Sequence, residues 1–145
     1  MLKFAGENPN CPLKAMIAVN NPFDITMNNH LMRGTIYEKY LIKATIQNVV
    51  SPDTRINFNI ERNVFKEMET KFGLDFDRLK QIQTWRDFDD QFTIKVNPHF
   101  KSAIAYHNAA SSLNSLHNIK VPTLVLHAKD DKITPVRCVP VEDLL

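Results

Sequence analysis

The feature that most constrains the fold is a pair of short apolar runs separated by a long stretch of helical pattern. Residues 15–19 (AMIAV) and 123–128 (TLVLHA) have the length and the β-branched content of buried strands. Residues 20–122 carry helical spacing and capping signals but no short β-turns. Two such strands would pair in parallel through a long crossover. We therefore predict an α/β fold in which a helical insertion interrupts a parallel sheet.

The two predicted strands are apolar at successive positions, so both faces of their sheet should be covered. Strands of this kind need helices on either side and further strands beside them. Two strands alone make a poor sheet. We therefore expect the missing strands to lie N-terminal to Met1 in a longer ancestor.

The rest of the chain contains several signals for the starts and ends of helices. Asp24 is a candidate N-cap, residues 35–38 and 84–87 are candidate capping boxes, and Gly73 is a candidate C-cap. A break is expected at residues 51–53, which contain a proline. Helices are predicted at residues 1–7, 35–46, 77–83, 98–107, 112–117 and 136–145. Another is predicted to begin at residue 24, and one more to end at residue 72.

Composition excludes several classes of protein. The chain has 145 residues and 43% hydrophobic content, which fits one compact unit. Its 18 Lys and Arg against 16 Asp and Glu are scattered, so we expect no nucleic-acid partner. No apolar run is long enough to span a bilayer, and the start is no signal peptide. We expect a soluble chain, with Cys11 and Cys138 as reduced thiols inside a cell.

Cofactor and nucleophile signals are missing from the sequence. The three glycines form no phosphate-binding cluster, and the five histidines lack metal-ligand spacing. We therefore predict no cofactor and no metal. Ser111, Ser112 and Ser115 lack the flanking glycines of a nucleophile elbow, so we interpret them as capping or surface residues.

Residues 119–135 (IKVPTLVLHAKDDKITP) resemble the α/β-hydrolase strand that ends in the loop carrying the triad acid. Three further stretches, residues 12–24, 88–93 and 100–113, are similar to other elements of the same family in the expected order. The similarity is greatest to the branch of medium-chain phospholipid and acylester hydrolases and their bacterial esterase relatives. The four stretches together span nearly the whole chain.

The resemblance implies a partial α/β-hydrolase fold. Residues 1–145 would be the C-terminal part of one domain, with a helical cap at about 24–90. It also implies a serine ester hydrolase of the carboxylesterase, acylglycerol lipase or phospholipid lipase type, acting on a small-molecule acyl ester or lipid. In the family, apolar cap residues form a lid over an acyl pocket, although core packing explains the same residues. They are Met27, Leu31, Met32, Tyr37, Leu41, Phe65, Met68 and Phe72.

The resemblance assigns the triad acid to Asp131. Asp130 is the alternative, and Lys132 replaces a common proline of the family turn. The carboxylate would hold the catalytic histidine in the correct tautomer. A solvated turn at the strand end explains the same two aspartates without catalysis. The serine elbow would precede Met1 and the histidine would follow Leu145, so we expect the chain as given to be inactive alone.

Two other classes of function remain open from the sequence. The chain is alternatively a non-catalytic fragment or pseudoenzyme that acts as an interaction module, pairing with an N-terminal hydrolase half. A third hypothesis is that the chain is an independent helical binding domain that resembles hydrolases in architecture alone. The location of the whole protein stays unknown, because family members often carry an N-terminal membrane anchor.

Overall fold

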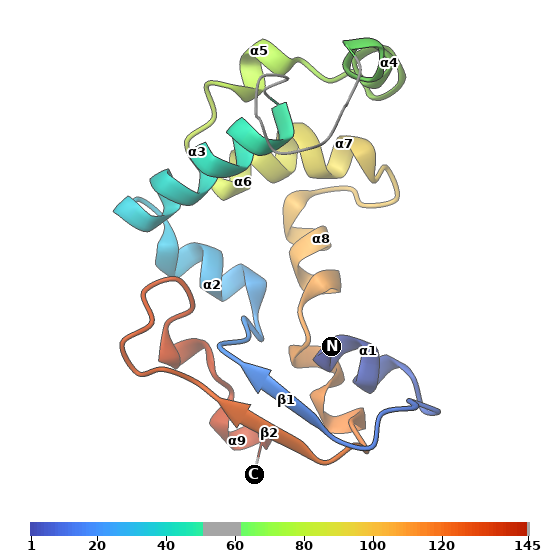
Figure 1. Ribbon diagram of the computed structural model, residues 1–145, viewed down its shortest axis with the longest axis vertical. Coiled ribbons are helices and arrows are strands. Elements are labelled where there is room, and N and C mark those ends of the chain that lie inside the picture. Colours follow the sequence, from blue (N-terminus) through green and yellow to red (C-terminus); the bar gives the residue numbers. More distant parts are fainter. Residues whose placement is uncertain (51–61, 145) are drawn as a thin grey trace. The chain divides into compact units, whose positions relative to one another are not determined.

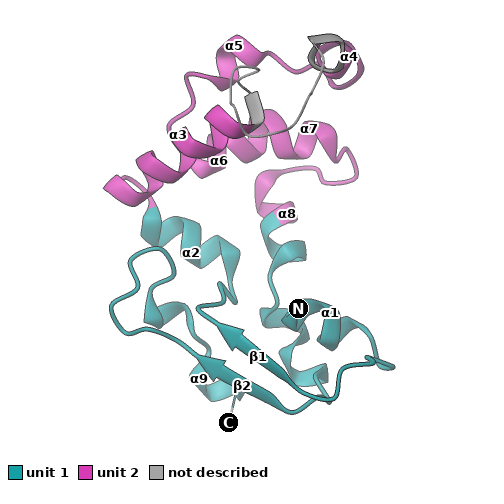
Figure 2. Ribbon diagram, viewed as in Figure 1, with its two compact units in different colours: residues 1–32, 107–145 teal, residues 33–106 magenta. Residues whose placement is uncertain are grey.

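The computed structural model describes residues 1–50 and 62–144, and the chain divides into two compact units (Figure 2). The sheet unit comprises Met1–Met32 and His107–Leu145. The helical unit comprises Arg33–Tyr106. The sheet unit is therefore assembled from two segments that are far apart in the sequence.

The sheet unit contains the two predicted strands as a parallel pair. Strand β1 (Met16–Val19) lies beside β2 (Thr123–Leu126), and their arrows point the same way in Figure 1. The register pairs Met16 with Thr123 and Val19 with Leu126. The backbone N–H of Asn20 donates to the carbonyl of Leu126 (2.9 Å), which extends the pairing to the strand ends. The predicted α/β fold with a long crossover is confirmed.

One face of this sheet is covered by short helices. Helices α1 (Leu2–Glu7), η2 (Leu113–Asn118) and α9 (Val141–Leu144) contribute to the core on that side. Gly6 allows α1 to approach η2 closely, since a Cβ at this position would lie 2.1 Å from the Ser115 carbonyl oxygen. The core side chains include Leu2, Ala5, Met16, Ala18, Phe23, Leu116 and Val125.

The opposite face of the sheet is apolar and exposed. Ile17 and Val19 of β1 are 61% and 64% exposed, and Leu124 and Leu126 of β2 are 53% and 48% exposed. The four side chains are adjacent because Ile17 pairs with Leu124 and Val19 with Leu126. Within the described residues, the expected cover is therefore found on one face only.

The helical unit encloses a core of its own. Six buried side chains form it: Ile42, Ile46, Leu74, Phe76, Leu79 and Phe88. Phe88 also stacks on Phe92 with ring centroids 5.2 Å apart. The elements are α3 (Ile36–Val50), α4 (Arg62–Phe72), α5 (Phe76–Leu79), α6 (Trp85–Phe88), η1 (Asp89–Thr93) and α7 (Ile94–Val96). No helix in the part of the chain that the structure describes is long and apolar enough to cross a membrane.

The predicted caps are present. Asp24 Oδ1 accepts the N–H of Met27 (3.0 Å) at the start of α2 (Ile25–Met32), and Thr84 Oγ1 accepts the N–H of Asp87 (3.1 Å). Gly73 follows α4 with φ of 61°, a left-handed conformation that glycine adopts without strain. These side chains fix the helix ends by satisfying backbone groups.

Glu38 makes hydrogen bonds beyond those of the predicted capping box. The N–H of Glu38 donates to Thr35 Oγ1 (3.2 Å), as the box requires. Its own carboxylate is 2% exposed and accepts the N–H groups of Gly34 (2.7 Å) and Trp85 (3.1 Å). One buried carboxylate thus ties the start of α3 to the start of α6.

Several helix boundaries differ from prediction, among them the end of α3, which is at Val50 and not at residue 46. The helix expected at 77–83 is α5, which Asp75 caps. The one expected at 98–107 is α8 (Ala103–Ala110), because Ser102 Oγ accepts the N–H of Ala105 (3.1 Å) and caps it there. The last helix is split into η3 (Val136–Cys138) and α9 around Pro140. The predicted break at 51–53 and the side chains of Val64 and Phe65 lie outside the described residues.

Candidate active site

The carboxyl ends of the two strands form the edge at which ligands bind in open parallel sheets. Asn20 follows β1 with a left-handed φ of 45°, and its Oδ1 accepts the N–H of Ala128 beyond β2 (2.9 Å). The two strand exits are therefore tied together by one asparagine. Asn tolerates this backbone conformation better than most residues.

Asp131 lies in the loop after β2 and shapes that loop. Its Oδ1 accepts the backbone N–H groups of Ile133 (2.8 Å) and Thr134 (2.9 Å). This is the local bonding by which aspartates stabilise turns. Its Oδ2 makes no hydrogen bond to any residue that the structure describes. One carboxylate oxygen thus holds the loop, and the other remains an acceptor.

Asp130 is held less firmly than its neighbour. Its side chain is exposed and makes no hydrogen bond or ion pair within residues 1–50 and 62–144, whereas Asp131 is half-buried. A positioned carboxylate must have its geometry fixed by its surroundings. The loop therefore holds the Asp131 carboxylate more firmly than that of Asp130.

His127 also holds this loop through a hydrogen bond, which the sequence did not predict. Its Nε2 lies 2.7 Å from the carbonyl oxygen of the buried Thr134, so Nε2 carries the proton and donates. Nδ1 is buried without a hydrogen-bond partner in the described part of the chain. Thr134 consequently bonds to both His127 and Asp131. No spacing in the sequence signalled this bond, because His127 follows β2 and Thr134 lies seven residues further along the chain.

The serines near this edge are engaged in structural bonds. Ser111 Oγ accepts the N–H of Ile25 (2.9 Å) and donates to the carbonyl of His107 (2.8 Å). Ser115 Oγ donates to the carbonyl of Ser112 (3.0 Å). All three serines are buried. The three serines are therefore buried and hydrogen-bonded, which differs from the surface role that the sequence left open for them.

His107 also makes a structural hydrogen bond within the sheet unit. Its Nε2 lies 3.3 Å from Nδ2 of Asn29, so the imidazole nitrogen accepts from the amide. Its side chain is 4% exposed. A buried, partnered histidine of this kind is a structural element that joins α2 to α8.

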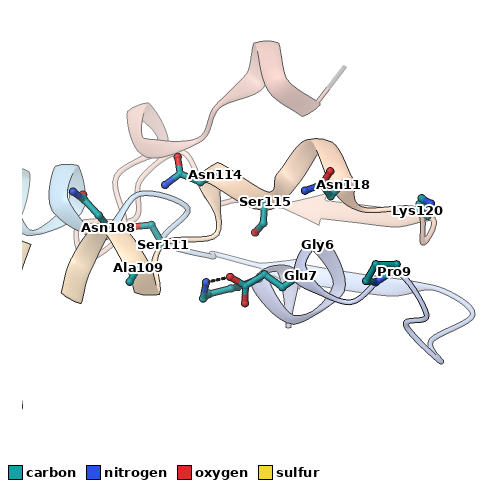
Figure 3. Close-up of a pocket in the computed structure, with 11 residues that line it drawn as sticks. Gly6, Glu7, Pro9, Asn108, Ala109, Ser111, Asn114, Ser115, Asn118 and Lys120 are labelled. Atoms are coloured by element: carbon teal, nitrogen blue, oxygen red, sulfur yellow. Dashed lines mark hydrogen bonds and ion pairs between the residues drawn. The ribbon is translucent and has the colours of Figure 1, made fainter. Parts of the chain in front are cut away.

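A polar pocket of about 540 Å³ lies beside α1 (Figure 3). Figure 3 shows α1 on one side and the segment from α8 to η2 on the other. Lys3 and Glu7 of α1 form an ion pair. Ser111 and Ser115 line it, but none of its described lining residues is a histidine or an aspartate. The described lining of the pocket therefore brings no histidine to either serine.

The surroundings of Cys138 do not activate its thiol. Burial raises the pKa of the Cys138 thiol, and the nearby Asp24 carboxylate adds to this, so the thiol stays protonated. Cys138 Sγ lies 3.9 Å from Asn28 Oδ1. Among the described residues no cluster of three or more His, Cys, Asp or Glu side chains could hold a metal ion.

Comparison with curated proteins finds relatives along nearly the whole chain. A monoacylglycerol lipase of Saccharomyces cerevisiae is 30% identical over 138 residues, covering 92% of this chain and 29% of the lipase. The medium-chain fatty acid ethyl ester synthase/esterase 2 of the same yeast is 26% identical over 141 residues (88% and 31%). An abhydrolase domain-containing protein of Dictyostelium discoideum is 26% identical over 133 residues (91% and 31%).

These matches relate the chain to the α/β-hydrolase superfamily. The parallel strand pair and the helical insertion agree with a partial α/β-hydrolase fold. The chain spans about a third of the length of the curated relatives it matches. No family model matches the chain, and no solved structure matches it. The chain is thus similar to about a third of these hydrolases, among which are a protein named an esterase and one named a lipase.

Proposed function

We propose that this chain is the C-terminal part of a serine ester hydrolase of the carboxylesterase or acylglycerol or phospholipid lipase type, with Asp131 as the triad acid. The observation that carries the proposal is the geometry of Asp131. Its Oδ1 is fixed by two backbone N–H groups, while Oδ2 has no partner among the described residues. The resemblance to esterases and lipases supplies the reaction class.

In this proposal Asp131 acts through a histidine supplied by another region of the whole protein. Oδ2 accepts the Nδ1–H of that imidazole, holds the tautomer and stabilises the imidazolium formed when the serine loses its proton. His127 and His107 are unsuited to this role, because each already uses Nε2 in a structural hydrogen bond. A preformed loop lets the carboxylate act without reorganisation.

We assign the cap of this hydrolase to residues of about 24–90. The helical unit, Arg33–Tyr106, supports an assignment of this kind because it encloses an apolar core within the crossover between the strands. The substrate is a small-molecule acyl ester or lipid. Its alkyl part would be bound by apolar cap side chains, since burial of each CH2 contributes about 0.8 kcal/mol.

The test begins with the transcript and the genomic DNA on both sides of this reading frame. We expect an in-frame G-x-S-x-G codon run upstream and a histidine codon downstream. The encoded full-length protein should then hydrolyse p-nitrophenyl esters and react with a fluorophosphonate probe at the elbow serine. Stop codons on both sides, or a full-length protein without esterase activity, would refute the proposal.

A second candidate function follows from the exposed sheet face. Ile17, Val19, Leu124 and Leu126 form an apolar surface of the kind that marks an interaction site. Their exposure favours pairing with a polypeptide that supplies the N-terminal half of a hydrolase. A tagged chain should capture that half when the two are co-expressed, and Leu124→Lys should abolish capture. Capture that survives Leu124→Lys would reject this surface as the interface.

A further inference from the structure

We propose that the helical unit contains a binding site for a fatty carboxylate, in the pocket between α3 and the connection from α5 to α6. All its described lining residues belong to the helical unit, and none belongs to the acid loop. The inference goes beyond ester hydrolysis, because it requires no serine, histidine or aspartate of a triad.

The pocket has an apolar floor. Its volume is about 720 Å³, within the range of about 300–1,000 Å³ for small-molecule sites. Ile42, Ile46 and Ile82 line it. Ile42 and Ile46 are also core residues of the unit, with exposed fractions of 2% and 7%. The floor is therefore continuous with the packed core, and Ile82 is the most accessible of its three isoleucines to an alkyl chain.

The rim of the pocket is cationic. Lys39, Lys43 and Lys80 line it, and none of its described lining residues is acidic. Lys80 is already neutralised, because its Nζ pairs with Asp77 Oδ1 at 2.8 Å. Lys39 and Lys43 form no ion pair with any residue in the described ranges. Two ammonium groups without an ion-pair partner among the described residues thus stand beside an apolar floor.

The spacing of the two lysines fits a single small anionic head. Lys39 and Lys43 are four residues apart on α3, which places them on one face with a rise of about 6 Å between them. A carboxylate between the two ammonium groups would contact both. The apolar stems of the lysines would continue the surface toward the isoleucine floor. The combination selects an alkyl chain with a negative end and disfavours a cationic amphiphile.

The probe is sodium decanoate, titrated below its micellar range into the full-length protein. Trp85 is the one tryptophan of the 145 residues, and it packs against the core that contains Ile42 and Ile46. Its fluorescence is therefore a local readout in this chain. If the encoded protein is longer and contains further tryptophans, binding is measured by isothermal titration calorimetry instead. We expect decanoate to bind at least about tenfold more tightly than decyltrimethylammonium, which has the same chain and the opposite charge.

Matched variants assign the binding to this pocket. Lys39→Gln combined with Lys43→Gln should weaken decanoate binding about tenfold, because the charge is lost while helix propensity is kept. Lys101→Gln is the control, since Lys101 is an exposed lysine of the same unit outside the pocket lining. Unchanged affinity in the double variant, or equal binding of decyltrimethylammonium, would overturn the proposal. Decyl phosphate binding tenfold more tightly than decanoate would overturn the carboxylate assignment in favour of a phosphate head.

Discussion

The sheet unit and the helical unit bury their apolar residues in different ways. The helical unit closes a core from neighbouring helices of one continuous segment. The sheet unit joins two distant segments around a strand pair and leaves Ile17, Val19, Leu124 and Leu126 exposed. The proposed acid, Asp131, lies in this less complete unit. The proposed chemistry therefore depends on long-range assembly, whereas the helical insertion depends mainly on its own packing.

The largest expected effect separates the two neighbouring aspartates of the acid loop. In the active full-length protein, Asp131→Asn should lower kcat for a p-nitrophenyl ester about 10⁴-fold, because the amide favours the wrong histidine tautomer. Asp130→Asn is the control and should lower kcat by less than about threefold, since Asp130 is exposed and unpartnered among the described residues. Equal losses in the two variants would remove Asp131 from its assigned role.

A glycine substitution tests how tightly the sheet unit is assembled. Gly6→Ala should lower the free energy of unfolding by about 3 kcal/mol, because the new Cβ would lie 2.1 Å from a backbone carbonyl oxygen. Gly34→Asn is the counterpart in the helical unit. No atom lies within 4 Å of its Cβ position, and Asn tolerates the φ of 77°. Urea unfolding followed by circular dichroism measures both, and a Gly6→Ala cost no larger than that of Gly34→Asn would contradict the close packing.

Removing the buried Glu38 carboxylate tests how much its hydrogen bonds contribute to the stability of the helical unit. Glu38→Ala should cost about 2 kcal/mol, because the N–H groups of Gly34 and Trp85 lose their acceptor. Glu67→Ala, at an exposed position of α4, should cost less than about 0.5 kcal/mol. Hydrogen exchange should show faster amide exchange in the helical unit and unchanged exchange along β1 and β2. Equal loosening of both units would mean that they unfold as one.

The smallest effect compares the two cysteines of the sheet unit. Burial raises the pKa of Cys138, so its thiolate is scarcer at pH 8 than that of an ordinary cysteine, and alkylation should accelerate only at higher pH. We expect iodoacetamide to modify half-buried Cys11 about tenfold faster than Cys138 in the folded protein. In urea the two rates should converge. Faster modification of Cys138 in the folded state would show that its surroundings are open.

Local signals in the sequence predicted most of the helix starts and both strands. Asp24, Thr84 and Gly73 act at helix ends as predicted, because capping bonds join residues that are close in sequence. The prediction for residues 98–107 missed the start of α8, because Pro98 was preferred to Ser102 as the first signal. Phe100 instead closes a turn on Asn97. Two acceptable start signals four residues apart cannot be ranked without knowing what each residue packs against.

The candidate site was predicted in part. The resemblance of residues 119–135 to a hydrolase acid loop singled out Asp131 over Asp130, and the geometry supports the same choice without testing its catalysis. The bond from His127 to Thr134 was missed, because nothing in the spacing required the strand's last residues to turn onto the loop. The role of Asn20, which joins the two strand exits, was missed for the same reason.

The sequence by itself determined the class of fold, because apolar runs and capping residues act through neighbours along the chain. Only the tertiary structure decided which sheet face is covered, which oxygen of Asp131 is engaged and which lysines of α3 border an apolar pocket. Those properties depend on the packing of segments as distant as α1 and η2, where Gly6 meets Ser115. Contacts of this kind are fixed by excluded volume and burial in three dimensions, and periodicity along one chain carries no record of them.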